Sequence, residues 1–390
     1  MKIQIAKKRV TNFVLLVVIC VAWFLIGWIV RGLWDANRIA QVETEVALIE
    51  QVRQRLLSEC PDGPLATREL TYGAIRGMLR QTGDPYAALL EPPVAQRFWD
   101  DFAGESGIVG LHLEEECGQL LVGGLSPGEP AEQAGLRPGD VILAVDGVEF
   151  DDATTGTEAS LLIRGPVGEP AHILVRRGEE TLDFYAARRE REIVSSQMLE
   201  GGIAYVALSA FVTDAPQEME AALQELVAQD PRGLIWDLRA NGGGSMQATQ
   251  EILSQFIADG LLFTAELKGG EQEPFTARAG GIATDIPLVV LIDHYTYSAG
   301  ETAAATVSER GRGTLIGDTT YGKSTINATY PLIEDCMVQM TIGKCLSPTG
   351  RWYHGQGVSP DIVVHDDAST EQDEVLESAL QYVQQGLPRE

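Results

Sequence analysis

The second half of the chain alternates between short apolar runs and amphipathic stretches, and this alternation constrains the fold more than any other feature. The run Ile203–Leu208 has the composition of a strand, and Asp214 followed by Pro216 is a typical beginning of a helix. The alternation continues through Leu234–Leu238, Met246–Ile257, Ile286–Ile292 and the alanine-rich stretch after Ser298. It predicts an α/β core whose loops converge at the ends of the strands.

Two segments of different character precede this core. Residues 35–102 favour helices, with apolar residues at helical spacings in Thr67–Arg80 and breaks at Asp84-Pro85 and Glu91-Pro92-Pro93. Residues 103–189 contain short β-branched runs separated by glycine and proline. This second pattern predicts a small β-rich module with one or two short helices.

The N-terminus carries an uncharged apolar run, Val10–Val30, behind the basic residues Lys2, Lys7, Lys8 and Arg9. At ~1.5 Å per residue, such a run can cross a hydrocarbon core of ~30 Å. Its bulky aromatic residues and the lack of a small-residue cleavage site favour an uncleaved anchor over a signal peptide. The basic cluster then predicts a cytoplasmic tip and transmembrane helix in residues 1–34, with everything after Arg31 on the far side.

Charge and residue spacing argue against several classes of function. A formal net charge of −27 leaves no basic stripe to neutralise phosphates, which argues against a nucleic-acid partner. Metal-ligand spacings such as C-x-x-C are absent, so we expect no metal and no other cofactor. Cys60, Cys117, Cys336 and Cys345 allow two disulfides of undetermined pairing. Cys336 and Cys345, however, would lie ~30 Å apart at the ends of one extended run.

The positions of Ser298 and Lys323 each allow a catalytic and a purely structural interpretation. Ser298 opens a helix after an apolar run, where free N–H groups and the helix dipole can hold an oxyanion. Serine at such a position is more often a simple N-cap. Lys323 follows 25 positions later, between two small residues. It is either a solvated turn lysine or, if burial lowers its pKa, a base for the serine proton.

A third stretch, Asp237–Gly244, runs from a strand end into three consecutive glycines. Such glycines let the backbone approach a ligand closely and point N–H groups into a site. The same composition also suits a tight turn between a strand and a helix. It is not a phosphate loop, because no G-K-[ST] follows in register.

Together and in this order, the three stretches resemble the carboxy-terminal processing peptidases, the tail-specific serine proteases. Tyr-Ser-Ala-Gly-Glu around Ser298 is similar to the nucleophile motif of that family, and Leu-Ile-Gly-Asp-Thr-Thr-Tyr-Gly-Lys, ending at Lys323, resembles its general-base motif. In the β-rich module, Gly-Glu-Pro-Ala-Glu-Gln-Ala-Gly-Leu-Arg-Pro-Gly-Asp-Val-Ile resembles its PDZ domain. The resemblance spans roughly residues 65–365 and implies an α/β peptidase core of crotonase-like fold with an inserted PDZ domain.

The resemblance also implies roles for individual residues. Ser298 is the expected nucleophile and Lys323 its base, with the N–H groups of Gly243 and Ala299 as oxyanion donors. A loop that binds the terminal carboxylate of a peptide, rather than a plain hairpin turn, is expected at Gly107, Ile108, Val109 and Gly110.

Two residues bear on the predicted catalytic machinery. Asn327 stands where the family has a glutamine that orients the lysine, and its amide is one methylene shorter. It can serve only if the backbone shifts or a water bridges the gap. His294, four residues before Ser298, would allow a Ser-His mechanism, but it has no obvious aspartate partner and ranks below Lys323.

The sequence therefore predicts a membrane-anchored serine endopeptidase with an anchor (1–34), a helical segment (35–102), a PDZ domain (103–189) and a peptidase core (190–390). It would recognise exposed C-terminal tails of protein substrates and cleave them by a Ser-Lys mechanism. Its catalytic domain would lie outside the cytoplasm at the cell membrane, and a homo-oligomer is compatible with the helical segment. One alternative is a weakly active or inactive membrane-tethered PDZ scaffold, supported by Asn327. The other is an esterase or amidase, for which a module that binds peptide termini would be superfluous.

Overall fold

The computed structural model describes residues 23–24, 28, 31, 43–61, 66–152, 154–366, 370 and 372–385. The chain divides into two compact units, Met1–Ile75 and Arg76–Glu390. In the first unit, residues 43–59 are helical. Helix α2 (Thr67–Arg80), which begins in the first unit, has the predicted bounds.

The predicted transmembrane helix is corrected by the structure. In the parts of the chain that the structure describes, no helix is both long enough and apolar enough to span a bilayer. A span needs about 20 consecutive apolar residues, whereas α2 has 14 residues and contains charged ones. This finding contradicts the predicted single-pass anchor, and with it the predicted location at the cell membrane with an extracytoplasmic catalytic domain. Most of Val10–Val30 lies outside the described residues.

The centre of the second unit is a six-stranded sheet with the order β17-β14-β13-β10-β9-β8. Its strands are β8 (Val194–Leu199), β9 (Ile203–Leu208), β10 (Gly233–Asp237), β13 (Leu288–Ile292), β14 (Gly313–Gly317) and β17 (Ile362–Val363). All neighbours run parallel except β8, which is antiparallel to β9. Every residue of β10 and β13 is buried, as expected for parallel strands covered on both faces.

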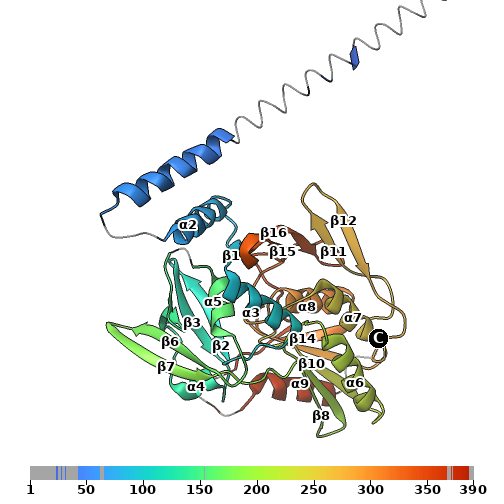
Figure 1. Cartoon of the computed structure of the whole chain (residues 1–390). Helices are drawn as coiled ribbons and strands as arrows, with labels where there is room; N and C mark the ends of the chain where they lie inside the picture. The colour runs from blue at the N-terminus through green and yellow to red at the C-terminus, as the bar shows by residue number, and fades with distance from the viewer. Residues whose placement is uncertain are drawn as a thin grey trace, which may run out of the picture. The chain divides into compact units, whose positions relative to one another are not determined.

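Helices cover both faces of this sheet (Figure 1). On one face lie α6 (Ala215–Val227), α7 (Met246–Phe256) and α8 (Ala299–Glu309), and on the other lies α9 (Glu374–Gln384). Successive strand residues point to opposite faces, so Trp236 packs with the first layer and Ile235 with α9. The predicted alternation of strands and helices is confirmed.

A second sheet has the order β1-β16-β11-β12, with β15 also paired to β16. Its strands are β1 (Ala88–Leu90), β11 (Leu261–Leu267), β12 (Gln272–Thr276), β15 (Thr325–Pro331) and β16 (Met337–Leu346). Strand β1 comes from the segment before the β-rich module, and its pairing with β16 joins that segment to the core. A turn, η1 (Ile333–Asp335), connects β15 to β16. None of the four described cysteines is in a disulfide.

The β-rich module forms a separate antiparallel sheet with the order β2-β3-β4-β6-β7, and β5 pairs with β4. Its strands are β2 (Leu111–Glu116), β3 (Gln119–Leu125), β4 (Val141–Val145), β5 (Val148–Glu149), β6 (Pro170–Arg177) and β7 (Glu180–Ala187). Helix α3 (Pro92–Ala103) precedes it, and α4 (Pro130–Ala134) and α5 (Gly156–Ile163) are its two short helices. The segment boundaries at residues 34, 102 and 189 stay predictions.

The β-rich module contacts the α/β core close to Ser298. His112 of β2 stacks on Tyr295, with ring centroids 4.2 Å apart and planes at 16°. Gly124 of β3 leaves room for this ring, because a Cβ there would lie 2.3 Å from the Tyr295 hydroxyl oxygen. Tyr295 precedes Ser298 by three positions, so the module packs against the turn that carries the serine.

Candidate active site

The three predicted stretches all follow the carboxyl ends of neighbouring parallel strands. The glycine loop follows β10, the turn to Ser298 follows β13, and the loop to Lys323 follows β14. In open α/β sheets, ligands bind at this edge because loops from adjacent strands meet there. The topology therefore brings together residues that are far apart in the sequence.

Ser298 lies on a strained turn between a strand and a helix. Its φ of 55° and ψ of −111° are unusual for a residue with a side chain, and such a conformation costs about 1–3 kcal/mol. Its N–H donates to Glu301 Oε2 at 3.0 Å. The strain sets the serine at the junction where helix α8 begins.

Glu301 connects the serine turn to the lysine loop. Its Oε2 accepts the N–H of Ser298 at 3.0 Å and that of Lys323 at 2.7 Å. Its Oε1 accepts the Gly322 N–H at 2.6 Å and the Thr320 hydroxyl at 2.7 Å. Glu301 is 2% exposed, and burial raises the pKa of its carboxyl while these hydrogen bonds oppose the rise. Glu301 is not among the residues predicted for the site, although a Glu three positions after Ser298 has the spacing of a capping box.

Lys323 is buried at the base of this arrangement. Its side chain is 8% exposed, and burial lowers the pKa of the amine to about 8, against the opposing charges of Glu301 and Asp84. Its Nζ lies 4.8 Å from the ring centroid of Tyr86 and 4.9 Å from that of Tyr297. A substantial fraction of this lysine is therefore neutral at mildly alkaline pH, as a base must be.

The glycine loop packs directly against the serine turn. Gly243 has a φ of 81°, and a Cβ there would lie 2.7 Å from Ser298 Cβ and 3.1 Å from the Ala299 nitrogen. The Gly243 N–H donates to Asn241 Oδ1 at 2.9 Å. In contrast, no backbone carbonyl in the described part of the chain accepts the N–H of Ala299. Of the two predicted oxyanion donors, Ala299 is therefore available and Gly243 is engaged.

The structure gives Asn327 and His294 other partners. Asn327 lies on β15, beside an irregularity in its pairing with β16, and its Oδ1 accepts the Thr325 hydroxyl at 3.3 Å. Within the described residues, no hydrogen bond joins it to Lys323. His294 is exposed and lies 4.0 Å from Glu114 of the β-rich module. Its low rank as a catalytic base stays a prediction.

Two of the four residues in the predicted carboxylate-binding loop donate their backbone N–H groups to carbonyls within the β-rich module. The Gly107 N–H donates to the Gly165 carbonyl at 2.7 Å and the Ile108 N–H to the Arg189 carbonyl at 2.9 Å. Val109 is buried in the core of the module. Among the described residues, no backbone acceptor binds the N–H groups of Val109 and Gly110, which directly precede the edge strand β2.

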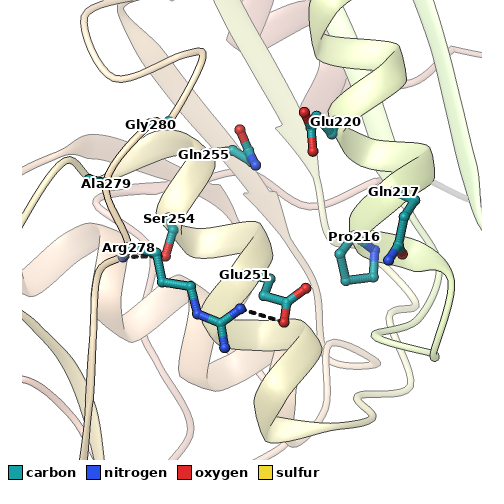
Figure 2. A pocket seen from close by; sticks show the side chains of 10 residues that line it. Pro216, Gln217, Glu220, Glu251, Ser254, Gln255, Arg278, Ala279 and Gly280 are labelled. Carbon is teal, nitrogen blue, oxygen red and sulfur yellow. Dashed lines mark hydrogen bonds and ion pairs between the residues drawn. The ribbon is translucent and has the colours of Figure 1, made fainter.

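Elsewhere, a cleft of about 310 Å³ opens between α6, α7 and the loop at residues 278–281 (Figure 2). Its charged lining includes Arg278, whose Nη1 pairs with Glu251 Oε1 at 2.6 Å. It contains none of the predicted site residues. The described residues also hold no cluster of three or more His, Cys, Asp or Glu side chains that could bind a metal ion.

An α/β sheet with a strained serine turn beside a buried lysine, joined to a PDZ-like module, defines a class of serine-type peptidases. The chain matches the model of peptidase family S41 over residues 202–364 and that of the PDZ domain over residues 121–177. A solved structure titled photosystem II D1 C-terminal processing protease shares 27% identity. It aligns over 85% of this chain and 90% of its own length with a TM-score of 0.65.

Curated relatives place the chain within this class. It is 34% identical over 311 residues to the carboxyl-terminal-processing protease of Synechocystis sp., covering 77% of this chain and 72% of that protein. It is 32% identical over 298 residues to the carboxy-terminal processing protease CtpA of Bacillus subtilis, covering 75% of this chain and 64% of that protein. The chain therefore belongs to the carboxyl-terminal processing proteases, which are serine-type peptidases of family S41.

Proposed function

We propose that this chain is an endopeptidase that binds exposed C-terminal tails at its PDZ domain and cleaves polypeptides with Ser298 and Lys323. The observation that carries the proposal is the shared Glu301 oxygen, which accepts the backbone N–H groups of both residues. One atom thus ties the serine turn to the lysine loop. The lowered pKa of Lys323 supplies the base that the serine needs.

In the proposed reaction, the neutral Lys323 amine takes the proton of the Ser298 hydroxyl as Oγ attacks the peptide carbonyl carbon. The resulting tetrahedral oxyanion collapses as the lysine ammonium donates its proton to the leaving amine. Water then attacks the acyl-enzyme and gives a proton to the Lys323 amine. When the acid product leaves, the Lys323 ammonium returns a proton to Ser298 Oγ. Each half-reaction returns Lys323 to its neutral form.

The geometry supports Ala299 as the first oxyanion donor, because its N–H begins the helix without a backbone acceptor. Gly243 is the second proposed donor, since its backbone lies against Ser298. Its N–H must turn from, or be shared with, Asn241 Oδ1. Substrate binding is the proposed cause of that change.

At the PDZ domain, the proposed ligand is a peptide that extends along the edge strand β2. Its terminal carboxylate would accept the N–H groups of Val109 and Gly110. The remaining predicted loop residues, Gly107 and Ile108, would shape the loop through their bonds to Gly165 and Arg189.

Cleavage of an unfolded test protein by the full chain, beside the variants Ser298→Ala and Lys323→Ala, tests the proposal. We expect cleavage by the parent only, with both variants folded by circular dichroism. Amidation of the test protein's C-terminus should then slow cleavage by the parent. Full activity in either variant would contradict the assignment of the catalytic pair.

One alternative has specific support: a PDZ protein that binds tails without cleaving them. Its support is that the Gly243 N–H is occupied by Asn241 and that Asn327 bonds to Thr325 instead of Lys323. A serine-reactive fluorophosphonate probe separates the two proposals. Labelling of the parent but not of Ser298→Ala would favour the peptidase, and no labelling of a folded parent that binds tails would favour the scaffold.

A further inference from the structure

The structure raises the question of what holds the Lys323 amine in place. Among the described residues, no group accepts a hydrogen bond from its Nζ, and no carboxylate lies within ion-pair distance of it. The oxygens of Glu301 are taken by four other donors. Those of Asp84 accept the N–H and hydroxyl of Thr341 at 2.7 and 2.9 Å and the Tyr86 N–H at 3.0 Å.

Two aromatic rings are the nearest partners of this nitrogen. The centroid distances of 4.8 Å to Tyr86 and 4.9 Å to Tyr297 are within the ~6 Å at which a ring face attracts an ammonium group. The rings come from different parts of the chain, one from the loop before β1 and the other from the residue before Ser298. Burial raises the pKa of both phenols, so both rings are neutral over the working range.

We propose that Tyr86 and Tyr297 are positioning residues that form an aromatic cage for the Lys323 amine, in place of a side-chain amide. This inference rests on the proposed function of Lys323 as the base for Ser298. A ring face attracts the hydrogens of an ammonium or amine group without donating to its lone pair. The cage can therefore hold the nitrogen while leaving the lone pair free for the serine proton.

The position of Tyr86 is itself fixed by the fold. Asp84 lies in the same loop and binds Thr341 of β16. Strand β1, which begins two residues after Tyr86, pairs with the same strand. The ring of His354 meets that of Tyr86 edge-on, with centroids 6.3 Å apart. Tyr297 is likewise braced by Tyr321, whose ring centroid is 5.0 Å away. The segment before the PDZ domain thus contributes directly to the site.

Several charged or titratable groups surround the cage. Glu301 of α8 and Asp84 of the loop before β1 favour the ammonium form of Lys323, and burial favours the neutral amine. His354, after β16, has a pKa lowered by burial and by Lys323 itself, and is neutral near pH 8. Tyr86, Tyr297 and Tyr321 are also titratable, and further charges act on two of them: Arg164 on Tyr297, and Glu114 and Glu115 on Tyr321. An aliphatic side chain in place of the Tyr86 ring would keep water out of the site but remove the π face. Such a change should therefore destabilise the ammonium form of Lys323.

The test is nuclear magnetic resonance of the full chain labelled with ¹⁵N at lysine Nζ. The chain has six lysines, and the Lys323 signal is the one that disappears in Lys323→Met. Position 86 carries in turn tyrosine, phenylalanine, and phenylalanines with one, two and three fluorine atoms, which weaken the ring face while enlarging the ring only slightly. Tyr86→Leu removes the face altogether.

We expect Tyr86→Phe to keep the pKa of Lys323, each fluorine to lower it, and Tyr86→Leu to lower it by about half to one unit. Peptide cleavage should show kcat falling about tenfold in Tyr86→Leu with KM within twofold of the parent. Tyr185→Leu, a surface tyrosine on β7, is the matched control and should change neither value.

An unchanged pKa of Lys323 across the fluorinated series would overturn the cage, and that series does not depend on the leucine variant folding. The proposed function has a separate readout. If the parent failed to cleave peptides while the series still shifted, the cage would stand and the assignment of Lys323 as a catalytic base would fail.

Discussion

In the proposed reaction, Lys323 accepts the serine proton only as a neutral amine. With a pKa of about 8, the fraction of neutral amine rises with pH through that value, and so should cleavage. Nearby negative charge favours the ammonium, and Glu301 is the charge with the largest effect. The pH at half-maximal activity therefore reports on the charge balance around one nitrogen.

Glu301→Gln should shift that midpoint to lower pH, because it removes a charge that raises the pKa of Lys323. It should also reduce kcat/KM by at least about tenfold. The amide nitrogen replaces an acceptor oxygen and cannot accept hydrogen bonds from the donors around it, and hydrogen bonds to a charged group contribute ~1.5–3 kcal/mol. A pH–rate profile measures both effects. Thr320→Val removes one donor but keeps the charge, so its midpoint should stay close to that of the parent. A midpoint of Glu301→Gln at or above the parent's value would contradict the argument.

Gly243→Ala should lower kcat/KM by at least about a hundredfold and cost roughly 1–3 kcal/mol of folding free energy. Its φ of 81° disfavours a side chain, and the new methyl would lie 2.7 Å from Ser298 Cβ. Gly242→Ala is the matched control, because a Cβ there meets only guanidinium nitrogens, at 3.7 Å or more. Urea unfolding and peptide cleavage measure the two effects. Equal behaviour of the two variants would count against close packing of the loop on the serine turn.

At the scale of elements, the loop before β1 is part of the site through its link to β16. Asp84→Ala removes the hydrogen bonds to the Thr341 N–H and hydroxyl. We expect faster hydrogen exchange at the Thr341 amide, a loss of ~2 kcal/mol of stability, and reduced kcat as Tyr86 moves. Asp259→Ala, at a side chain that is 91% exposed, serves as control. Unchanged exchange at Thr341 would show that the strand pairing alone holds the loop.

Much of the element pattern could be predicted from sequence because it depends on local periodicity. The bounds of α2 and α8 and the strands around them follow from apolar spacing and helix starts. The shared carboxylate of Glu301 and the approach of Tyr86 to Lys323 could not be predicted, because each depends on tertiary packing between distant segments. The engagement of the Gly243 N–H by Asn241 was beyond prediction for a similar reason, since it depends on the conformation of one loop. The anchor was predicted from hydropathy and the flanking basic residues, and the described helices do not bear it out.

At the scale of the whole molecule, the PDZ domain meets the peptidase core through His112 and Tyr295. Burial lowers the pKa of His112 to about 4. An unfolded chain takes up this proton near pH 6.5 and the folded one does not. Stability should therefore fall as pH drops from about 6.5 to about 4 and level off below, because the unfolded state binds more protons in that window.

His112→Phe should remove part of this acid sensitivity, because phenylalanine can still stack on Tyr295 but cannot be protonated. We expect the loss of stability between pH 6.5 and 4 to shrink by about 1–2 kcal/mol. The lost hydrogen bond to the Ser126 hydroxyl lowers stability equally at all pH values. Urea unfolding at several pH values measures the difference. His172→Phe, at a half-buried histidine of β6 that pairs with Asp183, is the control. An equal effect of the two substitutions would place the acid response elsewhere.

The Glu301 carboxylate also has a consequence for the life of the chain before folding is complete. Because the same group binds the serine turn and the lysine loop, the lysine loop should be held in its working position only once the start of α8 has formed. On the proposed function, a nascent or partly unfolded copy should therefore be inactive towards its neighbours and itself. On the proposed function, cleavage should therefore appear only when the serine turn and the lysine loop have both bound the Glu301 carboxylate.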